Sequence, residues 1–153
     1  MAAPPPLEFA FELVADVGEP QDLGLTPHGR RRIIAVLGGT FEGPSIRGRL
    51  LPGGADWQIV RADGTAELDA RYTLETSQGA LIYVSNRGLR HGPPQVIQKL
   101  NAGEPVDPRE YYFRTIAAFE TGAPECDWLT RSLFIGAAER YPRRVVVRFW
   151  KVG

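Results

Sequence analysis

The chain has 153 residues, of which 43% are hydrophobic and 24% charged, values typical of an ordinary globular domain. Its 18 basic and 18 acidic side chains balance, so no net field attracts nucleic acid or an anionic membrane surface. The single cysteine, Cys126, excludes an internal disulfide, and no apolar run is long enough to span a bilayer. We therefore expect a cytoplasmic protein with no nucleic-acid or membrane partner.

Short apolar runs between 17 glycines and 13 prolines predict many turns and few long helices. After a flexible Pro-rich leader at residues 1–6, residues 7–15 alternate apolar and polar side chains, as in a half-buried strand. Residues 18–30 hold several glycines and prolines and are predicted to form a loop. Residues 32–37 then lead into a glycine-rich stretch at residues 38–57. We expect this stretch to bend the sheet and to shape the mouth of a closed barrel.

The clearest local geometry is a hairpin around Asp63-Gly64, because Asp-Gly is a favoured two-residue turn. With these two residues as the turn, Asp56 lies directly opposite Arg71 on the polar face of the ribbon. Trp57 then belongs to the other, apolar face. The register does not say which face points inward.

The second half of the chain continues the pattern of short strands. Strands are predicted at residues 80–86, 111–119 and 144–152. Residues 95–100 are expected to form one or two turns of helix, and residues 128–136 fit either a strand or a short helix. About eight or nine strands in one domain over residues 7–153 predict an all-β fold, an antiparallel closed β-barrel with at most one short helix.

Seven motifs follow one another along the chain: Gly38-Gly39-Thr40-Phe41-Glu42-Gly43, Pro52-Gly53-Gly54-Ala55-Asp56-Trp57, Asp63-Gly64, Asp69-Ala70-Arg71-Tyr72, Tyr112-Phe113-Arg114, Phe119-Glu120-Thr121 and Trp128-Leu129. In this order they resemble the family catalogued as domain of unknown function 3237, small proteins of bacteria and fungi. The resemblance implies a compact β-barrel, and it implies no particular activity. The family commonly has an asparagine after the Trp-Leu pair, where this chain has Thr130.

The sequence gives little support for a metal-binding site or a nucleotide-binding site. The candidate zinc ligands His28, His91 and Cys126 are far apart in predicted loops. The glycine-rich stretch lacks the lysine and the following helix of a phosphate-binding loop. We expect no metal and no other cofactor.

Polar and aromatic residues around the predicted barrel mouth indicate an acid–base site. Asp56 or Glu42 is the expected base, and Arg71 and Arg114 are expected to stabilise developing negative charge. The alternative is that two ion pairs, Asp56–Arg71 and Arg114–Glu120, only hold strands together. The ligand contacts are expected from Trp57, Tyr83, Tyr112, Glu120 and Trp128.

Three functions fit these residues. The first is a small cofactor-independent enzyme that acts on a hydrophobic or aromatic carbonyl-containing metabolite in the barrel mouth, by isomerase, cyclase or lyase chemistry. The second is a non-catalytic, lipocalin-like barrel that binds a small apolar ligand. The third is a structural or interaction protein. In each case we expect a homodimer or a higher homo-oligomer.

Overall fold

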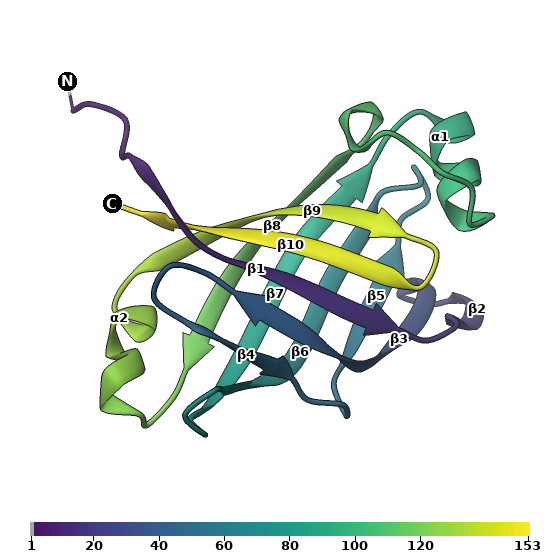
Figure 1. Ribbon diagram of the computed structural model, residues 1–153. Coiled ribbons are helices and arrows are strands. Elements are labelled where there is room, and N and C mark those ends of the chain that lie inside the picture. Colours follow the sequence, from purple (N-terminus) through teal and green to yellow (C-terminus); the bar gives the residue numbers. More distant parts are fainter. Residues whose placement is uncertain (1) are drawn as a thin grey trace.

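Ten antiparallel strands and two short helices make up the computed structural model, which describes residues 2–153 (Figure 1). The strands are β1 (Leu7–Val17), β2 (Gln21–Thr26), β3 (Gly29–Glu42), β4 (Arg47–Leu50), β5 (Ala55–Val60), β6 (Ala66–Thr76), β7 (Leu81–His91), β8 (Tyr112–Glu120), β9 (Leu133–Tyr141) and β10 (Arg144–Val152). The helices are α1 (Pro94–Asn101) and α2 (Asp127–Thr130). The predicted all-β barrel is confirmed, with two short helices where at most one was expected.

Eight of the strands close the barrel in the order β1, β10, β9, β8, β7, β6, β5 and β3, and β3 pairs back onto β1. Of the two further strands, β4 also lies between β3 and β6, and β2 pairs with the start of β3. Residues 18–30 were predicted as a loop. That prediction is wrong because these residues form a short hairpin of β2 with the start of β3, in which Gly24 lies at a register shift within β2 and Pro27 lies in the turn between Thr26 and Gly29.

The first part of the glycine-rich stretch forms a closing seam of the barrel. Gly38 to Gly43 lie where β3 pairs with β1, within and just beyond the end of β3. Gly39 has a φ of 151°, and a Cβ there would lie 2.0 Å from the backbone oxygen of Val14. Only glycine allows two backbones to approach this closely, so this residue permits the barrel to close.

The barrel interior is divided into an aromatic half and a polar half. The aromatic half lies toward α2, where the ring of Phe11 packs at 4.9 to 5.7 Å from those of Phe41, Phe119 and Phe149. All four side chains are buried, so this half is a filled core. The polar half lies toward the end where α1 follows β7 (Figure 1).

The hairpin between β5 and β6 has a three-residue loop, one residue longer than predicted. The backbone N–H of Arg61 donates to the oxygen of Thr65 at 2.8 Å, and Gly64 closes the loop with a φ of 86°. Asp56 therefore pairs with Ala70, and the predicted pairing of Asp56 with Arg71 is wrong. This shift of one residue exchanges the two faces of β5 but not those of β6, so that Asp56 and Gln58 join the inner face and Trp57 turns outward.

Candidate functional site

Asp56 lies inside the polar half of the barrel, where its carboxylate is held from two sides. Its Oδ2 accepts a hydrogen bond from Nε2 of Gln58 at 3.0 Å, and its Oδ1 accepts one from the backbone N–H of Asp69 at 2.9 Å. Gln58 is fully buried and accepts in turn from Nη1 of Arg32 at 3.3 Å. The carboxyl group therefore has a fixed orientation at the mouth.

The surroundings of Asp56 favour its protonated form. Burial has the largest effect and raises the pKa of Asp56 above the ordinary value of 3.8. The hydrogen bonds from Asp69 and Gln58 and the charge of Arg90 oppose this effect without cancelling it. Asp56 nevertheless keeps some solvent access. A carboxylic acid that is buried, oriented and still reachable can donate and accept protons.

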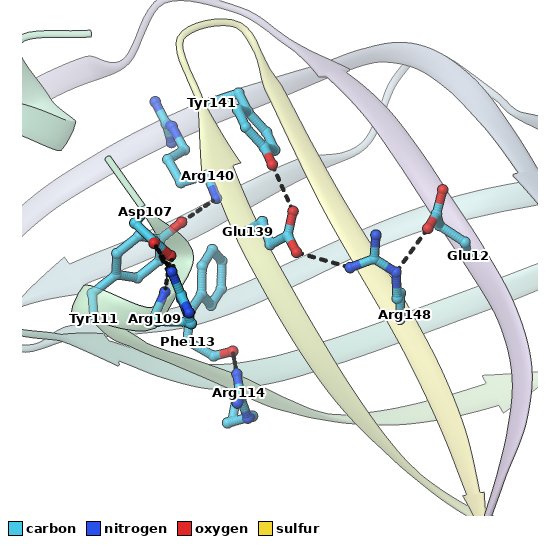
Figure 2. Close-up of polar contacts among 10 residues, drawn as sticks. All are labelled: Glu12, Asp107, Arg109, Tyr111, Phe113, Arg114, Glu139, Arg140, Tyr141 and Arg148. Carbon is cyan, nitrogen blue, oxygen red and sulfur yellow. Dashed lines mark hydrogen bonds and ion pairs between the residues drawn. The ribbon is translucent and has the colours of Figure 1, made fainter. Parts of the chain in front are cut away.

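Two further arginines reach the same region. Arg90 is only 5% exposed, and its guanidinium carbon lies 5.4 Å from the ring centre of Phe113. Burial and then repulsion from Arg140 lower the pKa of Arg90 to about 10, while Asp56 acts in the opposite direction. Burial is also the main cause that lowers the pKa of Arg140. The backbone N–H of Arg140 donates to Oη of Tyr111 at 2.9 Å (Figure 2).

Three buried polar atoms on the strands that follow β5 around the barrel have no hydrogen-bond partner among residues 2–153. They are Oη of Tyr72 on β6, Oδ1 of Asn86 on β7 and Oγ1 of Thr115 on β8. Asn86 is near enough to moderate the pKa of the Tyr72 hydroxyl, which burial raises, but the two do not align as a hydrogen bond. Such unpaired groups are costly in a protein interior and indicate a binding surface.

These groups surround one cavity of about 70 Å³, which also touches aliphatic side chains of β1, β3 and β10. The polar residues that line it are Asp56, Tyr72, Asn86, Arg90, Thr115 and Arg140. A single water needs roughly 10–15 Å³ on this scale, so the enclosed part accommodates only a few non-hydrogen atoms. Any larger ligand therefore has to extend out of the mouth.

The sequence reasoning identified Asp56 but missed the arginines and Asn86. A signal for two of them was present: along β7 the buried positions Ile82 and Val84 are followed, at the same spacing of two, by Asn86, Gly88 and Arg90. Polar residues that continue an apolar alternation face the interior. Gln58 gave no such signal, because its face depends on the hairpin register.

Most of the other predicted site residues lie on the outside of the barrel. Arg71 points outward, and its Nε lies 3.4 Å from Oδ1 of Asp69. Trp57, 39% exposed, is its outward neighbour on β5. Tyr83 and Glu120 pair across β7 and β8 with both side chains exposed.

Tyr112 and Arg114 share the exposed face of β8. The Arg114 guanidinium lies 5.8 Å from the ring centre of Tyr112, and its Nη1 donates to the backbone oxygen of Phe113 at 2.9 Å (Figure 2). Glu42 and Trp128 line a separate polar pocket of about 410 Å³ at the α2 end. The structure therefore places the predicted residues in three regions, and only Asp56 lies in the polar half.

Within residues 2–153, no helix is long and apolar enough to cross a membrane. The same residues contain no group of three or more histidine, cysteine, aspartate or glutamate side chains placed to hold a metal ion. The polar groups that line the cavity are thus guanidinium, amide and hydroxyl groups and a single carboxyl group.

Fold and site together define a small closed antiparallel barrel with a filled aromatic half and a polar mouth. Residues 5–152 match the family described as "Protein of unknown function (DUF3237)", and the chain belongs to this family. A UPF0311 protein of Rhodopseudomonas palustris (strain TIE-1) is 48% identical over 140 residues, 92% of each chain. The crystal structure of a conserved protein of unknown function from the same species has a TM-score of 0.95 at 44% identity, with full coverage of both chains.

A more distant similarity leads to a fungal enzyme. The hydroalkoxylation enzyme phnH of Penicillium herquei is 33% identical over 82 residues, which is 54% of each chain. A crystal structure of an enzyme from Penicillium herquei has a TM-score of 0.75 at 22% identity and covers 100% of this chain and 98% of that one. At this identity the structural likeness concerns the fold alone.

Proposed function

We propose that the protein is a cofactor-independent enzyme that performs acid–base chemistry on a hydrophobic or aromatic carbonyl-containing metabolite. The observation that carries this proposal is the Asp56 carboxyl group, buried and oriented by two hydrogen bonds, with a raised pKa, beside a cavity with unpaired polar atoms. Perturbed carboxyl groups in such surroundings are candidates for proton transfer. The distant similarity to a hydroalkoxylation enzyme supports the same class of chemistry.

Addition of an alcohol to an alkene illustrates what one carboxyl group can do. The protonated Asp56 donates its proton to one alkene carbon as the π bond breaks, and the substrate hydroxyl oxygen bonds to the other carbon. The Asp56 carboxylate then accepts the hydroxyl proton, which regenerates the acid. No electrons leave the substrate, so the step needs no redox cofactor. The same proton exchange isomerises or cyclises a carbonyl compound when the carbon atom next to the carbonyl is deprotonated.

A ligand-binding barrel without catalysis is the second candidate. It is favoured by the aliphatic walls of the same cavity, to which β1, β3 and β10 contribute Leu13, Val17, Ile34, Val36, Val145 and Val147. This candidate uses the same location but assigns no proton transfer to Asp56.

The two candidates are separated by incubating the protein in D₂O with a panel of hydroxyalkenes and aromatic ketones. NMR then records cyclisation and deuterium incorporation next to the carbonyl. We expect turnover by the wild type, and a loss of about 10²-fold or more in Asp56→Asn. Glu67→Gln, on the outer face of the neighbouring strand, is the matched control and should keep full activity. If Glu42→Gln abolishes turnover and Asp56→Asn does not, the reaction belongs to the α2 end.

We also propose that copies of the chain associate through the outer face of β7, β8 and β9. Alternate residues of β8 are exposed there, and Ile116, at 70% exposure, lies in a shallow groove of about 880 Å³ with Leu89 and Ile135. Exposed apolar surface of this kind is typical of protein contacts. Sedimentation of the wild type should show a dimer or larger, and Ile116→Lys should shift it toward monomer. A monomeric wild type contradicts this proposal.

A further inference from the structure

We propose that the polar mouth binds an anionic oxygen of its ligand, a carboxylate or phenolate on an apolar body, between Arg90 and Arg140. This inference rests on the proposed function only in placing the substrate at the Asp56 end. It specifies which part of the substrate the protein recognises.

The polar half carries an excess of positive charge. The charge of Arg32 lowers the pKa of both Arg90 and Arg140, and the charge of Arg140 lowers that of Arg90. Asp56 is the main acidic group that opposes this repulsion. Asp22 lies near Arg32 and Glu19 near Arg140, but the cavity itself is lined by two guanidinium groups, Arg90 and Arg140, and by the single carboxyl group of Asp56. Uncompensated charge is costly in surroundings with little water, and a bound anion removes that cost.

Arg90 and Arg140 also differ from other arginines of the barrel in how their charge is compensated. Arg148, on the outer side of β10, bridges Glu12 at 2.9 Å and Glu139 at 2.8 Å (Figure 2). In residues 2–153 neither Arg90 nor Arg140 forms such an ion pair with a carboxylate. Within the described residues, exposed arginines such as Arg47 and Arg87 also lack an ion pair, but water solvates their charge, whereas Arg90 is buried without a carboxylate partner.

The cavity offers hydrogen-bond donors for an anionic group and aliphatic walls. Guanidinium groups donate in a fork that matches the two oxygens of a carboxylate. The unpaired atoms of Tyr72 and Thr115 line the same cavity and supply further hydrogen bonds. The remaining walls are aliphatic, which suits an apolar ligand body rather than a fully hydrated ion such as phosphate.

Binding of such an anion has a consequence for Asp56. The charge of Arg90 favours the Asp56 carboxylate, and an anion paired with Arg90 weakens that effect. The anion also repels the carboxylate directly, so binding shifts Asp56 further toward its protonated form. The bound ligand would thereby keep the Asp56 carboxyl group protonated. Where Asp56 is ionised before binding, it would take up a proton from solution as the ligand binds.

Calorimetry with a matched pair of probes tests the inference. Benzoate and its neutral analogue benzamide are titrated into the wild type and into Arg90→Met, Arg140→Met and Arg131→Met in a buffer of low chloride. We expect the wild type to bind benzoate at least tenfold more tightly than benzamide. The preference should disappear in Arg90→Met and fall in Arg140→Met. It should persist in Arg131→Met, which removes an exposed guanidinium beside α2. Benzoate titrations in two buffers of different ionisation enthalpy should show net proton uptake in the wild type.

Equal affinity for the two probes in the wild type overturns the inference, as does a preference that survives in both mouth variants. Tighter binding of inorganic phosphate than of benzoate also overturns it, because it indicates a site for a hydrated ion. Far-UV circular dichroism checks each variant. If Arg90→Met does not fold, Arg140→Met decides, since Arg140 is less deeply buried. Because these titrations need no turnover, their outcome is independent of the Asp56→Asn test.

Discussion

The two halves of the barrel interior are built from the same strands but differ in how completely their side chains are satisfied. Strand β8 contributes Phe119 to the aromatic half and Thr115, with an unpaired hydroxyl, to the polar half. One half is a closely packed core, and the other holds buried charges and polar atoms without partners. Proteins accept such locally unfavourable groups at functional sites because the rest of the fold supplies the stability. This difference is why we consider the polar half the candidate site.

The largest effect is expected in the aromatic half. Phe11→Ala should lower the free energy of unfolding by about 3–5 kcal/mol, because a fully buried ring leaves a cavity among three other rings. Chemical denaturation measures the change. Leu7→Ala, on the same strand but 53% exposed, is the control and should change stability little. A small loss in Phe11→Ala would mean that this half is not the stabilising core.

The polar half should make stability depend on pH through Asp56. Its pKa in the folded state is raised above 3.8, so the folded protein binds a proton that the unfolded chain has released. This contribution is complete below the unfolded pKa and is lost as the pH rises through the folded pKa. Each unit of difference corresponds to about 1.4 kcal/mol.

Asp56→Asn should therefore gain stability relative to the wild type as the pH rises above the ordinary carboxyl pKa of 3.8 and through the raised pKa of the folded state. Urea midpoints at several pH values measure this trend. A relative stability that falls with pH would show that the folded protein favours the carboxylate, and it would remove the physical basis for a general acid.

Removing a hydroxyl group should have opposite consequences at two tyrosines of the polar half. Tyr72→Phe removes a buried Oη without a partner and should leave stability unchanged or raise it by about 1 kcal/mol. Tyr111→Phe removes the acceptor of the Arg140 backbone N–H and should cost about 1–2 kcal/mol. Thermal or urea unfolding compares the two. An equal loss in both would mean that the Tyr72 hydroxyl is already satisfied in the folded protein.

The sequence was sufficient to predict the barrel, because strand spacing and turn residues repeat along the whole chain. It was insufficient for the site, because the site depends on a register that differs by one residue. Asp63-Gly64 fits either a two-residue turn or the end of a three-residue loop with Gly64 at positive φ, and only packing across the barrel selects the second. The unpaired state of Arg90 is likewise a property of strands distant in sequence.

The smallest effect is expected at Arg71, which the two-residue turn would have placed beside Asp56. In the observed register Arg71 lies outside the barrel, with its side chain 52% exposed and paired only with Asp69. An exposed pair of this kind contributes little, since water and salt screen both charges. Arg71→Met should therefore leave the urea midpoint, the benzoate preference and any turnover unchanged, whereas Arg90→Met removes the benzoate preference. If Arg71→Met instead weakened benzoate binding as Arg90→Met does, the two-residue turn would be correct in solution and Arg71 would lie on the same face as Asp56.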